Sequence, residues 1–202
     1  KSIRRAQSKV EKNNFSIRKR QLEYDDVLNN QRKVIYSRRR HALEGERLHV
    51  DILNMLYDLI DYIVDRHYGE GGFEDMREDL LGMLAFDYDM PDRDTAVSWG
   101  QEELVERIYE AAVEHYSRKR ELIARPLHEA VERLVDSDLE DKPEQLFVDF
   151  TDGNRVLRAK VSVEEAMQSK GQIVNDTLER VAMLSIIDEV WTDHLRELDE
   201  LK

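Results

Sequence analysis

The side chains that could do chemistry in this sequence are one pair of neighbouring carboxylates and one run of arginines. Asp188 and Glu189 interrupt an apolar helical pattern and could form a catalytic acid pair, as in a hydrolase. Adjacent residues on a helix point about 100° apart, however, so a polar contact with another element is the simpler interpretation. The run from Arg38 to Arg40 could bind phosphate, but cations at a helix end are also favoured by the helix dipole. Neither group indicates an enzyme on its own.

Sequence motifs that bind nucleotides or metals are missing. There is no GxxxxGK[ST] loop, and no GxGxxG, GxSxG or HExxH pattern. The six histidines, at positions 41, 49, 67, 115, 128 and 194, show no paired ligand spacing. The absence of cysteine excludes disulfides, thiolate zinc sites and cysteine nucleophiles. We therefore expect this chain to have no catalytic residues, no metal site, no bound cofactor and no affinity for ATP.

The composition favours long, solvated helices. Of the 202 residues, 37% are charged and only 7% are aromatic. Charge interrupts every long apolar stretch, as Asp58 and Asp61 do in "MLYDLIDYIV", so we expect no transmembrane segment. The sequence starts at Lys1 without a methionine and stops inside a helical pattern at Lys202, which leads us to expect a piece of a longer protein.

The charge is unevenly distributed along the chain. Residues 1–43 carry 13 Lys and Arg against 4 Asp and Glu, whereas residues 44–202 carry 18 against 40. A stand-alone nucleic-acid-binding protein that uses the basic first segment is therefore an alternative. Against it, the acidic remainder can supply counter-charge within the chain, and Asp25 and Asp26 at the centre of the segment would oppose phosphate. We expect a strut with docking faces and no nucleic-acid partner.

Residues 1–43 contain neither glycine nor proline and predict one long helix. Apolar residues recur along it in two stripes, and two stripes imply packing on two sides, whereas a coiled-coil strand needs only one. The first stripe is Ile3, Val10, Ile17 and Tyr24, continued by Leu28, Ile35 and Ala42, and the second is Phe15, Leu22 and Tyr36.

Further helices are predicted over 48–68, 74–86 and 101–123, with a break or kink at Pro126 before helical spacing resumes. The segment "DMPDRD" is expected to be a loop. The last helix is predicted to run from Asn175 or Asp176 to the end of the chain. Its apolar seam is Val181, Leu184, Trp191, Leu195 and Leu198, and we expect this face to pack on the first stripe of the long helix.

Between these helices, "EQLFVDFTDGNRVLRAKV" predicts a β-hairpin. Asp152-Gly153 favours a tight type I′ turn. A two-residue loop would place Val148 opposite Leu157 and Leu146 opposite Ala159, on a face that should pack against a helix. Ser162 and Glu165 are spaced as a capping box for a short following helix.

Three stretches resemble segments of the SecA family, the ATPase motors of bacterial preprotein export. "AQSKVEKNNFSIRKRQLEYDDVLNNQRKVIYSRR" is similar to the long scaffold helix of that family, through the pattern Q-x-x-V-E-x-x-N-F-x-I-R-K from Gln7 to Lys19 and L-E-Y-D-D-V-x-x-x-Q-R-x-x-I-Y from Leu22 to Tyr36. "LSIIDEVWTDHLRELDELK" resembles the segment that enters the two-helix finger. "EELVERIYEAAVEHYSRKREL" resembles the end of the helical wing domain.

The resemblance implies a mainly α fold in which a long scaffold helix packs on a C-terminal helix, with an inserted helical wing that carries one small β-hairpin. The scaffold would comprise residues 1–43 and 173–202, and the wing residues 44–172. Residues of about 124–172 look like an extension that the compact wing of many relatives lacks. The resemblance also implies domain-docking residues, namely Phe15, Arg18, Leu22, Tyr24, Asp25, Asp26, Gln31, Arg32, Tyr36, Asp188, Trp191, His194 and Leu195.

The function implied by the resemblance is that of a non-catalytic part of an ATP-driven protein translocase. ATP and magnesium would bind in domains outside this chain. The chain would couple hydrolysis there to preprotein export through the SecYEG channel and restrain the ATPase activity. Its partners would be the remaining SecA domains and, through the parent protein, the channel and the preprotein. The expected location is the cytoplasm and the inner face of the cell membrane, as a peripheral protein.

Overall fold

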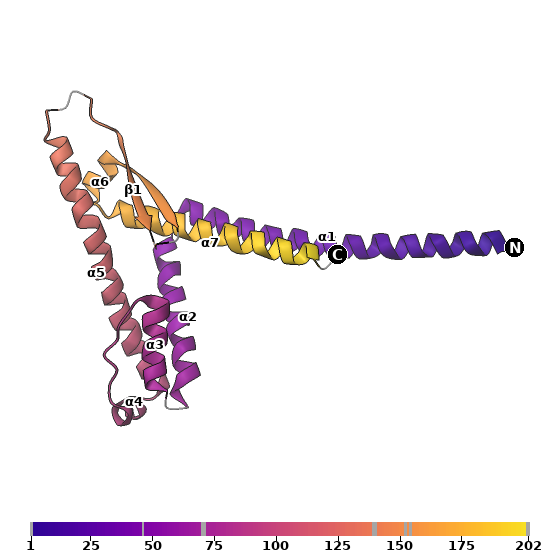
Figure 1. Cartoon of the computed structure of the whole chain (residues 1–202), viewed down its shortest axis with the longest axis horizontal. Helices are drawn as coiled ribbons and strands as arrows, with labels where there is room; N and C mark the ends of the chain where they lie inside the picture. Colours follow the sequence, from indigo (N-terminus) through magenta and orange to yellow (C-terminus); the bar gives the residue numbers. More distant parts are fainter. Residues whose placement is uncertain are drawn as a thin grey trace. The chain divides into compact units, whose positions relative to one another are not determined.

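The computed structural model describes residues 2–45, 47–69, 72–138, 141–151, 153 and 155–200. Within these ranges the chain forms seven helices and one two-stranded sheet (Figure 1), so the predicted mainly α class is confirmed. The chain divides into two compact units, one of Lys1–Glu44 with Met183–Lys202 and the other of Gly45–Ala182. None of the described helices is long and apolar enough to cross a membrane.

The first unit contains α1 (Ser2–Glu44) and the part of α7 (Ile173–Glu200) that begins at Met183. The predicted single long helix is confirmed, since no glycine or proline interrupts it. α7 lies alongside the C-terminal part of α1 (Figure 1). Accordingly, Tyr24, Leu28 and Ile35 are half-buried, whereas the earlier members of the same stripe are exposed: Ile3, Val10 and Ile17.

The second unit is built on α2 (Leu48–Tyr68), α3 (Phe73–Leu84), α4 (Arg93–Trp99) and α5 (Gln101–Val135). α2 and α5 supply the centre of its core, because both are amphipathic and turn their apolar faces inward. The buried cluster is Ile60, Ile63, Val64, Met76, Leu80, Phe86, Ala96, Leu104, Val105, Ile108 and Ala112.

Two helix boundaries differ from the prediction, and one short helix was not predicted. α3 ends at Leu84 rather than at residue 86, because Ala85 adopts a left-handed conformation (φ 48°) and ends the helix. α4 begins at Arg93, within the last two residues of the segment predicted as a loop, and Asp92 caps it by accepting a hydrogen bond from the Thr95 amide at 3.0 Å. α7 begins at Ile173, slightly before the predicted start.

Of the two alternatives at Pro126, the break is wrong, since α5 continues through it to Val135, and the kink stays a prediction. Proline removes one helical hydrogen bond. Burial of Ala124, Leu127 and Val131 on either side offsets that cost, because these residues face a second apolar core. Packing that the local sequence does not reveal therefore keeps the helix continuous.

The predicted hairpin is present as β1 (Gln145–Thr151) and β2 (Val156–Ser162), but its register is different. Val148 lies opposite Ala159 and Leu146 opposite Val161, and the pairing ends at Thr151 and Val156, which are further apart in sequence than a two-residue loop allows. The predicted turn pair includes Asp152, which lies outside the described residues. A shift of two positions keeps each side chain on its predicted face, because side chains alternate with period two.

The inner face of the hairpin packs against α5, as predicted, and completes the second core. Ser162 caps α6 (Val163–Gln168) by accepting a hydrogen bond from the Glu165 amide at 3.5 Å. Gly171, with φ of +83°, lies so close to α5 that a Cβ atom there would be 2.2 Å from the Ala124 carbonyl oxygen. The cluster comprises Leu127, Val131, Ala159, Val161, Ala166 and Val174.

Candidate docking interface

In the first unit, two hydrogen bonds connect α7 to the face of α1 that carries the first stripe. We call this line of contact the α1–α7 seam. The Tyr24 hydroxyl donates to the Leu198 carbonyl oxygen at 3.1 Å, and His194 Nε2 lies 3.1 Å from Gln31 Oε1. The residue numbers increase along α1 as they decrease along α7, so the two helices are antiparallel. Both contacts are partly buried, which makes their loss costly because a buried polar group would be left without a partner.

A third contact joins Arg39 and Asp188 further along the same seam. The guanidinium donates twice to the carboxylate, from Nε to Oδ1 at 2.9 Å and from Nη2 to Oδ2 at 3.3 Å. These bonds raise the pKa of Arg39 above its ordinary value. Because the side chains are 43% and 53% exposed, the pair adds little to stability.

Trp191 lies half-buried on the α7 side of this seam. Its ring is 5.6 Å from the His194 ring, and it borders a cavity of about 440 Å³ together with Ile35 and Tyr36 of α1. The predicted packing of the first α1 stripe on the Trp191 face is therefore confirmed for the C-terminal part of α1. Because Trp191 is only half-buried, we expect it to stabilise the helix pair less than a fully buried tryptophan would.

The second stripe of α1, which we call the outer stripe, is Phe15, Leu22 and Tyr36. These side chains are 64%, 65% and 57% exposed. At about 100° per residue, Phe15 and Leu22 lie on the side of α1 opposite Tyr24 and Leu28, whereas Tyr36 lies on the flank next to Ile35. The structure thus leaves one apolar face of α1 uncovered within this unit.

The predicted docking residues consequently fall into two groups. The structure gathers one group along the α1–α7 seam and leaves the other at the surface of α1. The seam holds Tyr24, Gln31, Asp188, Trp191, His194 and Leu195, and the exposed positions are Phe15, Arg18, Leu22, Asp25, Asp26, Arg32 and Tyr36.

A polar network in the second unit was not predicted. Arg120 Nη2 donates to Asp176 Oδ1 at 2.7 Å, and Arg120 Nη1 donates to Glu179 Oε1. The Tyr116 hydroxyl donates to the same Glu179 oxygen at 2.6 Å. Asn175, which is buried, donates to the Arg120 carbonyl oxygen at 2.9 Å. The network fastens the first turns of α7 to α5.

The network consists of side chains that are paired with one another. Burial raises the pKa of Tyr116, and the hydrogen bond to Glu179 raises it further, so the phenol keeps its proton near neutral pH. Asp176 and Glu179 each accept a hydrogen bond from Arg120. Among the residues that the structure describes, no group of three or more acidic or histidine side chains is able to hold a metal ion.

Comparison with known proteins identifies relatives over the whole chain. The profile of the family described as SecA Wing and Scaffold domain matches residues 1–202. The protein translocase subunit SecA of Salinibacter ruber is 57% identical over 202 residues, and that of Porphyromonas gingivalis is 40% identical over 202. Both alignments cover 100% of this chain, residues 124–172 included, but only 17% and 18% of the relatives. No solved structure matches the chain.

Proposed function

Because the chain belongs to the SecA wing and scaffold domain family, we propose that it is the non-catalytic module through which a protein translocase couples ATP hydrolysis to preprotein movement. The observation that carries this proposal is the two-sided character of α1. One face is engaged by α7 through Tyr24 and Gln31, and the outer stripe is exposed. A helix with two apolar faces is suited to connect one packed partner with another.

The outer stripe is the surface on which another domain of the translocase would rest. Covering a large apolar side chain stabilises a complex by about 1.5–3 kcal/mol. The chain spans 17–18% of the length of the curated relatives, so most of such a protein lies outside it. ATP and magnesium would bind there, and α1 would transmit the resulting movement.

The partners of this module would be the remaining domains of the translocase and, through them, the SecYEG channel and the preprotein. The α1–α7 pair would restrain the ATPase until the channel engages, because partly buried hydrogen bonds from Tyr24 and Gln31 hold α7 against α1. Such a protein would work in the cytoplasm and at the inner face of the cell membrane, as a peripheral component.

Two substitutions in the full-length translocase test the coupling role. Tyr24→Ala removes a half-buried ring and its hydrogen bond to α7, so preprotein should stimulate the ATPase less than in the parent protein. Arg39→Ala removes only an exposed ion pair and should leave the stimulation close to normal. Normal stimulation in the Tyr24 variant beside a strong loss in the Arg39 variant would contradict the proposal.

A further inference from the structure

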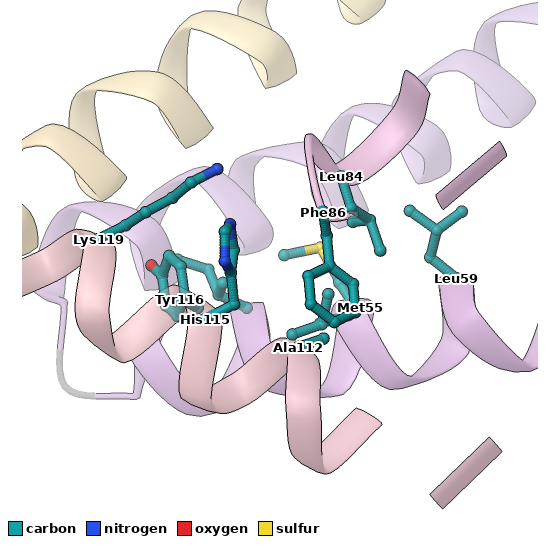
Figure 2. A pocket seen from close by; sticks show the side chains of 10 residues that line it. Met55, Leu59, Leu84, Phe86, Ala112, His115, Tyr116 and Lys119 are labelled. Atoms are coloured by element: carbon teal, nitrogen blue, oxygen red, sulfur yellow. The ribbon is translucent and has the colours of Figure 1, made fainter. Parts of the chain in front are cut away.

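The second unit contains an apolar pocket of about 290 Å³ between α2, the end of α3 and α5. Figure 2 shows Met55, Phe86 and His115 gathered at its centre, with Lys119 at one end and Leu59 at the other. The walls are otherwise aliphatic or aromatic, and ligand pockets typically combine such walls with a few polar groups. The full lining is Ile52, Met55, Leu56, Leu59, Leu84, Phe86, Ala112, His115, Tyr116 and Lys119.

His115 places a polar atom in this apolar setting. Its Nε2 is buried and has no hydrogen-bond partner among the described residues. The Phe86 ring, 5.2 Å away, packs against the imidazole and limits its rotation. A buried polar atom without a partner costs stability, so a ligand that supplied the missing hydrogen bond would be favoured.

Lys119 supplies a positive charge beside the same pocket. Its Nζ donates to the Ala85 carbonyl oxygen at 3.2 Å, and an ammonium group has two further donors. Within the described ranges no carboxylate forms an ion pair with Lys119, although residues 44–202 carry 40 Asp and Glu against 18 Lys and Arg. Ala85 holds this carbonyl in place through its left-handed backbone, with φ of 48°.

We propose that this pocket binds a small amphipathic carboxylate, such as a medium-chain fatty acid. The apolar body would lie against Met55, Leu59 and Phe86, and the carboxylate would accept hydrogen bonds from His115 Nε2 and Lys119 Nζ. At about 30 Å³ for each water-sized group, the volume accommodates roughly ten non-hydrogen atoms, as in octanoate. The proposal does not depend on the coupling role of the chain, since all lining residues belong to the second unit.

Calorimetric titration with octanoate, octanol and octylammonium separates the contributions of the apolar body and the charge. Octanoate should bind saturably with a Kd of about 1 mM or tighter. Octylammonium should bind at least about tenfold more weakly, because its charge would face Lys119. Lys119→Gln should weaken octanoate binding about tenfold and leave octanol binding unchanged. Lys160→Gln, on β2, is the matched control and should leave all three unchanged.

A second variant tests the location of the site. Met55 is 47% exposed, so Met55→Trp can fill the pocket without disturbing the buried core, and it should abolish octanoate binding while circular dichroism stays unchanged. Three results would overturn the proposal. The first is that octanoate binding does not saturate at about 10 mM. The second is that octanol binds as tightly as octanoate and Lys119→Gln has no effect. The third is that a folded Met55→Trp protein binds octanoate as well as the parent protein does.

Discussion

Arg120→Ala is the substitution expected to destabilise the chain most clearly through its polar contacts. The side chains of Arg120 and Glu179 are only 17% and 10% exposed, so the change leaves a nearly buried carboxylate with the Tyr116 hydroxyl as its remaining partner. Removing one partner of a buried ion pair costs about 3–5 kcal/mol. Asp176 is 50% exposed and can be solvated again, and Tyr116 still donates to Glu179, so we expect a loss near the lower value.

Urea unfolding of the chain measures this loss. With a slope of about 2 kcal/mol per molar, a loss of about 3 kcal/mol lowers the midpoint by about 1.5 M. Arg118→Ala is the matched control, because Arg118 forms an exposed i,i+4 pair with Glu114 on the same helix and its removal should cost less than about 0.5 kcal/mol. Arg120→Met combined with Glu179→Met should recover most of the loss, since no buried charge is left unpaired. Equal midpoints for Arg120→Ala and Arg118→Ala would refute the reasoning.

Two other substitutions test the packing of each unit. Gly171→Ala should lower the free energy of unfolding in urea by more than about 2 kcal/mol, because a Cβ would meet the Ala124 carbonyl and φ is +83°. Gly82→Ala is the control, since Gly82 has open space around it inside α3, and it should stabilise the chain by about 0.5–1 kcal/mol. The reverse order would disprove the close approach of Gly171 to α5. Trp191→Ala should cost about 2 kcal/mol, roughly half the value for a fully buried tryptophan; the adjacent Val190→Ala, 62% exposed, should cost less than about 0.5 kcal/mol, and equal costs would mean that Trp191 does not pack on α1.

The spacing of apolar residues predicted which face of a helix or strand is buried better than it predicted which residues lie opposite that face. The spacing of Tyr24, Leu28 and Ile35, four and then seven residues apart, identified the face of α1 that α7 covers, because a core-facing stripe must recur at helical spacing. Alternation likewise assigned Val148 and Ala159 to the inner face of the hairpin. The register was wrong by two positions, since alternation determines the face and leaves open which residues lie opposite each other.

Contacts between distant residues could not be predicted from local patterns. Arg39 and Asp188 were each singled out, but nothing in the sequence paired them across 149 positions. Arg120 and Glu179 are 59 positions apart, and each looked like an ordinary surface charge on a helix. α4 was missed because seven residues are too short for a periodic signal, although Asp92 and Thr95 show the spacing of a helix cap.

The central claim is that the outer stripe of α1 is covered by another domain in the full-length translocase. Leu22→Cys tests it directly, because the chain has no cysteine and Leu22 is 65% exposed in it. Maleimide labelling of this position, read by mass spectrometry of the peptide, should be at least about tenfold slower in the full-length protein than in the chain alone. Asn30→Cys, an exposed position on the flank of α1, is the control for general accessibility. Equal labelling rates for Leu22→Cys in the two proteins would contradict the two-sided strut.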